Sequence, residues 1–282
     1  MKSLMLRLLT IILLSSTILL AQNTNNIESK LINFIDKAVN TGKNYKFVKA
    51  EISHSEDVPN MKGWKAYFLK MDLQILSQKR NISVKDIIFS NGQFISKDFI
   101  NMNTGRSIKS DFSFPASAKL YDDTHFLLGN KNAKNKLILF SDPLCPFCMD
   151  FVPDLVNFVE KHPKQFALYY YYFPLSIHPG SQYLVRAILA TKKIKHIKDL
   201  DKKVYSMAFD FPKASEDEVI NQFNKAFDTN LTKAELNTKD ITERINYDMK
   251  VANDLMVRGT PTLYVNGKKD PSRSIYKKLV KE

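Results

Sequence analysis

The stretch that decides the fold of this chain is FSDPLCPFC, residues 140–148, which holds both of its cysteines. Two residues separate Cys145 from Cys148, a spacing that fits a redox pair or one half of a metal site. The stretch overlaps the end of NKLILFS, a continuous apolar run of the length of a buried strand, and a helical pattern follows it. The sequence therefore predicts a strand, a short loop and a helix that begins at Cys145.

A cysteine at the start of a helix faces unpaired backbone N–H groups and the positive end of the helix dipole, and both favour the thiolate. Pro146 suits the first helical position, where no backbone N–H is needed. We therefore expect the pKa of Cys145 to lie below the ~8.5 of a free cysteine, and we expect Cys145 to be the nucleophile. Cys148 lies one turn further along the helix, close enough to attack the sulfur of Cys145 and release a mixed disulfide.

A metal site is the less favoured alternative. Zinc needs four ligands, usually a second cysteine pair or two histidines, and this chain has two cysteines and five histidines without paired ligand spacing. We expect no metal and no cofactor other than a reversible Cys145–Cys148 disulfide. A disulfide across two residues closes a very small loop and so constrains the unfolded chain little, which argues against a purely structural bond.

Residues 121–282 show the alternation of strands and helices that is typical of an α/β layer fold. FALYYYYF predicts a second buried strand, and a long helical stretch follows over about 180–256. Gly259-Thr260-Pro261 then precedes a strand at 262–265 and a turn. We expect Pro261 to be cis, so that it holds a tight turn against the cysteine helix. A short helix from about Ser272 closes the chain.

Residues 22–105 predict a smaller α+β unit. The apolar side chains of 27–41 fall on one helix face, and strand patterns follow. One of them, DIIFSNGQFIS, has Asn91-Gly92 at a hairpin turn. Residues 106–120 have little periodicity and several small side chains, so we expect a linker there.

The first 21 residues predict the compartment. Lys2 and Arg7 precede an apolar run of signal-peptide length, and a polar stretch follows at once. We expect a cleaved signal peptide and a periplasmic protein, although Leu19 is larger than the residue usual at that position; a retained membrane anchor is the alternative.

The net charge of +13 comes from lysines scattered along the chain, without nucleic-acid-binding motifs. This pattern favours a solvated basic surface and no nucleic-acid partner.

The second unit resembles a thioredoxin-fold domain. FSDPLCPFC is similar to the active-site stretch of the periplasmic DsbC/DsbG branch, with the DsbG type most similar. Asp142 matches the aspartate three residues before the first cysteine of that branch, and Thr260 matches the threonine before its cis-proline. Pro153 matches the kink proline of the thioredoxin fold. The resemblance is specific over 136–160 and 257–267 and architectural elsewhere.

This resemblance implies a homodimer built through N-terminal, cystatin-like dimerisation domains, with two redox sites facing an apolar cleft. It implies a disulfide isomerase or reductase that acts on exported proteins with cysteines and is kept reduced by a membrane thiol reductase. Pro146, Phe147, Thr260 and Pro261 would bind substrate or shape the site, and an extended substrate would pair with the backbone at Thr260. A DsbA-like oxidase, with a membrane oxidase as partner, and a dimeric holdase chaperone are the alternatives.

Two positions depart from related proteins. Phe147 replaces the histidine of the DsbA type and the tyrosine common in the DsbC/DsbG branch, and phenylalanine donates no hydrogen bond toward Cys145. We therefore expect the thiolate to depend on the helix start and backbone alone, and the protein to be a mild oxidant. Leu139 stands where thioredoxin and DsbA have a buried carboxylate, which leaves proton transfer to water or to a group that the sequence does not name. We expect Asp142 to cap the loop before the helix and His178 to be a loop or helix-start residue without a catalytic role.

Overall fold

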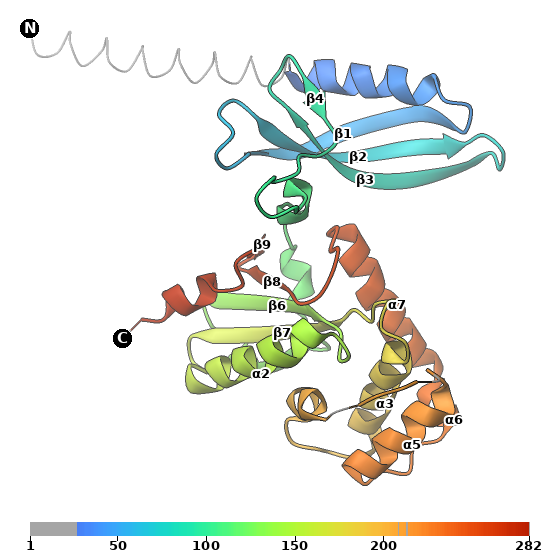
Figure 1. The fold of residues 1–282 in the computed structure, drawn as a ribbon, viewed down its shortest axis with the longest axis vertical. Coiled ribbons are helices and arrows are strands. Elements are labelled where there is room, and N and C mark those ends of the chain that lie inside the picture. Colours follow the sequence, from blue (N-terminus) through green and yellow to red (C-terminus); the bar gives the residue numbers. More distant parts are fainter. Residues whose placement is uncertain (1–26, 208, 213, 282) are drawn as a thin grey trace, which may run out of the picture. The chain divides into compact units, whose positions relative to one another are not determined.

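The computed structural model describes residues 27–207, 209–212 and 214–281, so the predicted signal peptide, 1–21, lies outside the described residues. The chain divides into two compact units, Met1–Phe112 and Ser113–Glu282, which Figure 1 colours from blue to green and from green to red. The boundary between them falls inside 106–120, the segment expected to be a linker. None of the described helices combines the length and the apolar character needed to cross a membrane.

The expected linker is divided between the two units, and each half is held by its own unit. On the first side, Lys109 of the 3₁₀ helix η1 (Ile108–Asp111) donates through its ammonium group to the Asp86 carboxylate at 2.6 Å. On the second side, the Ala116 N–H donates to the Gly267 carbonyl at 2.8 Å, just before η2 (Ala118–Leu120). The segment is therefore structured over much of its length.

The first unit packs a helix over residues 27–40 on an antiparallel sheet of order β1-β2-β3-β4. The alternation along β2 places Tyr67 and Leu69 on the face that meets the helix, where they are buried with Leu31 and Ile35. Asn91-Gly92 forms the predicted hairpin turn, with the Asn91 side chain accepting from the Phe94 N–H at 2.8 Å. The strands are β1 (Tyr45–Asp57), β2 (Lys65–Ile75), β3 (Arg80–Ser90) and β4 (Ile95–Ser96).

The second unit is built on a five-stranded mixed sheet of order β5-β7-β6-β8-β9, in which β6 and β7 are parallel. These two central strands are the continuous apolar runs of the sequence, and β7 is buried along its whole length, as parallel strands covered on both faces should be. The strands are β5 (Phe126–Gly129), β6 (Asn135–Ser141), β7 (Phe166–Tyr172), β8 (Thr262–Val265) and β9 (Lys268–Lys269).

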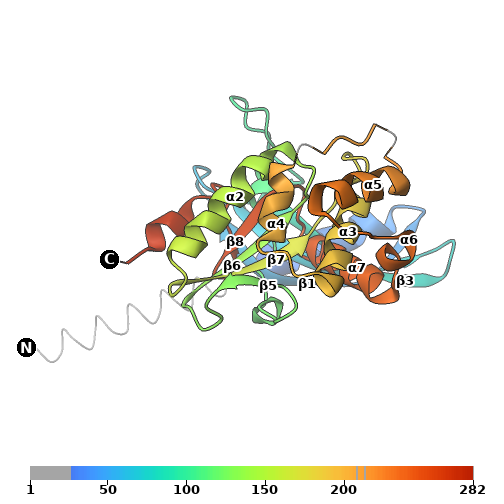
Figure 2. The ribbon, with the colours of Figure 1, turned by 90° about the horizontal axis from the view of Figure 1, so that it is seen from below.

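Helix α2 (Pro146–Lys161) connects β6 to β7 and lies across the sheet, while the helical insertion gathers at one end of it (Figure 2). The side chains of α2 that face the sheet are apolar and buried, with Val152, Leu155 and Val159 at its centre. The insertion comprises α3 (Ser181–Ile194), α4 (Leu200–Lys203), η3 (Val204–Ser206), α5 (Glu216–Phe227), α6 (Lys233–Leu236) and α7 (Lys239–Asp254).

Two helices of the insertion begin at capping residues, whereas the end of the chain differs from expectation. Ser215 accepts from the backbone N–H of Glu218, and Thr232 forms a capping box with Glu235. The expected helix from Ser272 is a shorter 3₁₀ helix, η4 (Ile275–Leu279). The reason is local, because the Asp270 carboxylate binds the Ser272 hydroxyl and the Ile275 N–H and so holds the chain in a turn before the helix.

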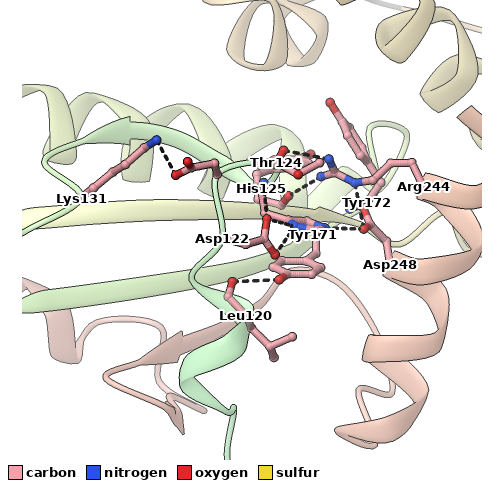
Figure 3. Close-up of polar contacts among 11 residues, drawn as sticks. Leu120, Asp122, Thr124, His125, Lys131, Tyr171, Tyr172, Arg244 and Asp248 are labelled. Carbon is pink, nitrogen blue, oxygen red and sulfur yellow. Dashed lines mark hydrogen bonds and ion pairs between the residues drawn. The ribbon is translucent and has the colours of Figure 1, made fainter. Parts of the chain in front are cut away.

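A buried polar cluster fastens the insertion to the sheet (Figure 3). The ring of His125 lies between two carboxylates, with Nδ1 2.7 Å from Asp122 and Nε2 2.7 Å from Asp248. Asp248, on α7, also accepts from the Arg244 side chain at 3.0 Å and from the Tyr172 N–H of β7 at 2.9 Å. Since a buried carboxylate is tolerated only when it is paired and hydrogen-bonded, these contacts fix α7 against β7.

We expect Asp248→Ala to lower the free energy of unfolding by about 3–5 kcal/mol, because it leaves the buried His125 and the half-buried Arg244 without their shared carboxylate. Asp254→Ala is the matched control on the same helix, since Asp254 forms an exposed pair with Lys250; exposed pairs contribute little. Urea unfolding followed by far-ultraviolet circular dichroism measures both variants. Equal stability losses in the two variants would contradict the role given to Asp248.

Candidate active site

The cysteine pair lies where strand β6 gives way to helix α2. Cys145 is the N-cap residue with extended backbone angles, Pro146 is the first helical residue, and Cys148 lies in the first turn. The Cys145 N–H donates to the Asp142 carbonyl at 3.1 Å, which shapes the short loop between strand and helix. Both cysteines are free thiols; Cys145 is 3% exposed and Cys148 is fully buried. The predicted strand, loop and helix around Cys145 are therefore present.

The second part of the site comes from the other end of the sequence. The Thr260–Pro261 peptide bond is cis, as predicted. Strand β8 pairs with β6 so that Thr262 lies opposite Phe140, and this register carries the preceding loop to the cysteine helix. The Cys145 Sγ lies 3.4 Å from the Thr260 carbonyl oxygen, although 115 residues separate the two. Sheet pairing therefore brings together the two segments that the sequence analysis singled out.

Hydrogen bonding lowers the pKa of Cys145 to about 5. The largest contribution is a hydrogen bond from the Cys148 thiol, which outweighs the opposing effect of burial, and the backbone N–H groups of Cys148 and Phe147 add to it. The expectation that the helix start and backbone alone stabilise the thiolate is therefore incomplete, because the Cys148 side chain also contributes. The Phe147 side chain is 71% exposed, and only its backbone acts on the sulfur.

The pKa of Cys148 moves the other way. Burial raises the pKa of this thiol well above its ordinary value, and the nearby Cys145 adds to the rise. At neutral pH, Cys145 is therefore the thiolate and Cys148 the thiol. This division gives the pair one ionised nucleophile and one protonated thiol beside it, which is the arrangement that thiol–disulfide exchange uses.

Asp142 has a larger role than the loop cap expected from the sequence. Its carboxylate is fully buried and accepts from the backbone N–H of Leu144 at 2.9 Å, as a cap would. It also accepts from the Leu175 N–H at 2.7 Å, lies 2.7 Å from His178 Nδ1 and accepts from the Ser181 hydroxyl at the start of α3. His178 is thus a loop residue, as expected, but one that is held to the active-site loop.

The sequence contained a signal for this contact. Strands β6 and β7 are parallel, so the segments that follow them, SDPLC and FPLSIHPGS, leave the sheet at the same edge. A buried aspartate at one strand end and a histidine after the other were candidates for a pair. The sequence analysis did not connect them because the parallel pairing of the two strands had not been established.

Apolar side chains beside the site are exposed to solvent. Phe147 is 71% exposed and Ile177 is 75% exposed. Phe147 belongs to the first turn of α2, and Ile177 belongs to the loop that Asp142 holds through Leu175 and His178. Exposed apolar side chains on these two segments suit contact with apolar parts of another chain.

Comparison with known proteins supports the fold of the second unit. The family model described as thioredoxin matches residues 121–281, more than half of the chain, and the protein therefore belongs to the thioredoxin family. The predicted thioredoxin fold of this unit is thereby confirmed, and the predicted thiol–disulfide oxidoreductase chemistry agrees with it. A search of curated proteins found no match.

Solved structures with a similar fold include a thioredoxin-like oxidoreductase from Silicibacter pomeroyi DSS-3, with 23% identity, a TM-score of 0.48 and coverage of 58% of this chain and 95% of that one. The catalytic domain of Proteus mirabilis ScsC has 22% identity and a TM-score of 0.43, with 57% and 90% covered. Oxidised BdbD from Bacillus subtilis has 18% identity and a TM-score of 0.45, with 60% and 96% covered.

We expect alkylation of the reduced protein to titrate with a midpoint at about pH 5, the pKa of Cys145, instead of the ~8.5 of a free thiol. Cys148 is expected to stay unmodified because its thiol is buried and protonated. Iodoacetamide labelling across a pH series, followed by mass spectrometry, measures both residues, with Cys145→Ser as the control. A midpoint near that of glutathione would contradict the thiolate.

The same pKa predicts how the stability of the reduced protein depends on pH. The folded-state pKa of Cys145 lies below the unfolded value, so the thiolate stabilises the folded chain fully above pH ~8.5, and this stabilisation is lost as the pH falls through about 5. The difference in unfolding free energy between the reduced protein and Cys145→Ala is expected to shrink over that window. A difference that stays constant with pH would contradict the prediction.

Replacing Cys148 by alanine is expected to raise the pKa of Cys145, because it removes the largest of the hydrogen bonds that lower it. Cys148→Ser keeps a donor at the same place and is expected to give an intermediate pKa. The alkylation series described above measures both. If Cys148→Ala left the titration of Cys145 unchanged, the helix start and the backbone would be sufficient for the thiolate.

Proposed function

We propose that this chain is an exported thiol–disulfide oxidoreductase that isomerises or reduces disulfides in other exported proteins through Cys145 and Cys148. One arrangement carries the proposal: Cys145 begins helix α2 with the buried Cys148 in the first turn and with its Sγ 3.4 Å from the Thr260 carbonyl of the cis-proline loop, and hydrogen bonding lowers the pKa of Cys145 to about 5. A structural pair would not need one thiol ionised and the other protonated. Family membership supports the same chemistry.

The geometry supports two successive exchanges. In the first, the Cys145 thiolate attacks a substrate disulfide; a Cys145–substrate disulfide forms, the substrate disulfide breaks, and the other substrate sulfur leaves as a thiolate. If that thiolate or another substrate cysteine attacks back, Cys145 is released and the substrate disulfide is rearranged. If Cys148 attacks the sulfur of Cys145 instead, the substrate leaves reduced and the protein keeps the Cys145–Cys148 disulfide. A membrane thiol reductase would then restore the dithiol.

We assign the protein to the DsbC/DsbG branch on its residues. The CPFC pair, the buried Asp142, the threonine before the cis-proline and the apolar Leu139 are the features that support this assignment. The backbone at Thr260 would pair with an extended substrate, and the exposed Phe147 and Ile177 would contact its side chains. Residues 1–21 support export to the periplasm.

The first unit is the proposed dimerisation domain. Strand β1 is 13 residues long and has β2 as its single neighbour in the described sheet, so its outer edge is open to pairing with a second copy. Tyr45 and Val48 on this strand are exposed apolar residues. Sedimentation of the full chain as a dimer would agree with this assignment, and a monomer would contradict it.

A DsbA-like oxidase is the second candidate, and the pKa of Cys145 favours it. A stabilised thiolate stabilises the reduced protein relative to the disulfide and so makes the disulfide a stronger oxidant. The sequence analysis expected a mild oxidant, because Phe147 donates no hydrogen bond to Cys145. The pKa of Cys145, about 5, is lower than a mild oxidant would need. In this alternative a membrane oxidase replaces the reductase as redox partner.

We expect the protein to reactivate ribonuclease that carries scrambled disulfides, and Cys145→Ser to abolish this activity because it removes the nucleophile. Cys148→Ser is expected to keep part of the isomerase activity and to lose the reduction of insulin, which needs the second thiol. Recovery no faster than with Cys145→Ser would remove the isomerase assignment. If the protein oxidised fully reduced ribonuclease faster than it reactivated the scrambled form, the oxidase would be favoured.

A further inference from the structure

An exposed isoleucine stands at the tip of a tight turn that is bound to the active-site loop. The His178 N–H donates to the Leu175 carbonyl at 3.0 Å, which closes the turn. Ser176 and Ile177 are its two central residues. Central positions of turns favour glycine, asparagine, aspartate, serine and proline. Ile177 is β-branched, apolar and 75% exposed, so neither turn geometry nor burial explains an isoleucine at this position.

The fully buried carboxylate of Asp142 holds this turn at both ends. Its Oδ2 accepts from the Leu175 N–H at 2.7 Å and lies 2.7 Å from His178 Nδ1. Its Oδ1 accepts from the Leu144 N–H at 2.9 Å and from the Ser181 hydroxyl. Because an ionised carboxylate only accepts hydrogen bonds, His178 donates through Nδ1. Each oxygen therefore has two donors, and one carboxylate ties the turn to the active-site loop and to the start of α3.

The same aspartate connects the turn to the reactive cysteine, because its backbone carbonyl accepts from the Cys145 N–H at 3.1 Å. The Ser141 carbonyl accepts from the Phe173 N–H at 2.8 Å, so the two segments leave the parallel strands β6 and β7 side by side. Beyond the turn, Gly180 has a φ of +86°, and a Cβ there would lie 2.9 Å from Cδ2 of Phe211. The turn is therefore fixed on both sides before a substrate binds, which reduces the entropy cost of binding.

We propose that the Leu175–His178 turn is a substrate-specificity element, in which Ile177 contacts an apolar side chain of the segment bound at Cys145. Asp142 and His178 are its positioning residues. The proposal rests on the proposed function, because it concerns how the substrate of the disulfide exchange is selected. Apolar side chains are mostly buried in folded proteins. The substrate class is therefore unfolded or misfolded chains that have an apolar side chain next to the reacting cysteine.

A single exposed apolar side chain is ordinary on a protein surface, and the attachment of the turn distinguishes Ile177. The turn is bound through its Leu175 N–H to the residue that accepts the Cys145 N–H. Ile194, which is 56% exposed, offers a comparison. It lies at the other end of α3, roughly 20 Å of helix away from Ser181. An apolar side chain there has no connection of this kind to the cysteine pair.

The test uses two peptide disulfides in which attack by the reduced protein separates a fluorescent dye from its quencher. One peptide has leucine next to the reacting cysteine, and the other has serine there. The rate of a single turnover, measured against peptide concentration, gives a half-saturating concentration and a limiting rate. For wild type we expect the leucine peptide to half-saturate at a concentration about tenfold lower, because partial burial of leucine favours binding. The two limiting rates are expected to be equal.

Replacing the isoleucine tests the contact itself. In Ile177→Asn we expect the two peptides to half-saturate at similar concentrations, with the limiting rate unchanged. Asparagine is favoured in turns, so this change keeps the turn while it removes the apolar side chain. Ile194→Asn is the matched control and is expected to keep the wild-type preference for leucine. Alkylation of Cys145 checks that both variants retain the thiolate.

Histidine variants test the positioning of the turn without changing Ile177. His178→Ala removes the side-chain hydrogen bond to Asp142, and we expect the loosened turn to lose most of the preference for leucine. His178→Asn retains an amide donor close to the position of Nδ1 and is expected to restore the preference. A histidine with a merely structural role would affect stability in these variants without separating the two peptides. Circular dichroism checks that each variant is folded.

The outcomes distinguish this inference from the proposed function. If wild type cleaves neither peptide, Cys145 is not a reactive thiolate and the proposed function fails. If wild type cleaves both peptides with equal half-saturating concentrations, or Ile177→Asn keeps the preference, the role of Ile177 is overturned while the oxidoreductase assignment stands. An equal loss of preference in Ile194→Asn would overturn it as well. If His178→Ala keeps the full preference, the positioning role is overturned.

Discussion

The hydrogen bond from the Cys148 thiol to the Cys145 thiolate is the interaction on which the site depends. It forms only while α2 begins at Cys145, because one turn of helix sets the separation of the two sulfurs. That start is fixed by β6, which ends at Ser141, and by the buried apolar face of α2, which holds the helix against the sheet. The pairing of β6 with β8 adds the Thr260 loop. The scaffold therefore acts mainly by holding one helix end in place.

Buried carboxylates of the second unit join its sheet to the active-site loop and to the helical insertion. Asp142 joins the active-site loop to the start of α3, Asp201 joins α4 to β7, and Asp248 joins α7 to β7. Each carboxylate is almost fully buried and has several donors, so each contact is costly to break. These contacts fix the position of the helical insertion relative to the strands that lead into the cysteine pair. Apolar packing alone would specify this position less sharply.

Local patterns in the sequence predicted the elements and the cysteine chemistry, and long-range polar contacts were beyond their reach. FSDPLCPFC and Gly259-Thr260-Pro261 could be interpreted because strand ends, helix starts and proline geometry depend on neighbouring residues. The run Tyr169–Tyr172 was correctly interpreted as part of a buried strand. A run of identical residues does not indicate which group each tyrosine hydroxyl binds. Those of Tyr170, Tyr171 and Tyr172 bind three different groups, which come from residues 205, 120 and 201. Only the fold brings such partners together.

The direction of electron flow depends on the relative stability of the dithiol and the disulfide forms. The Cys145 thiolate alone does not determine this relative stability. Hydrogen bonds to Cys145 stabilise the dithiol, so the disulfide tends to pass its bond to a substrate. The same thiolate is also what an isomerase needs to attack a substrate disulfide. Part of this stabilisation comes from Cys148, whose proton is lost on oxidation, so the two cysteines together decide how strongly the disulfide form is disfavoured. Whether the pair repairs or donates disulfides would then be decided by whether the proposed redox partner supplies or removes electrons.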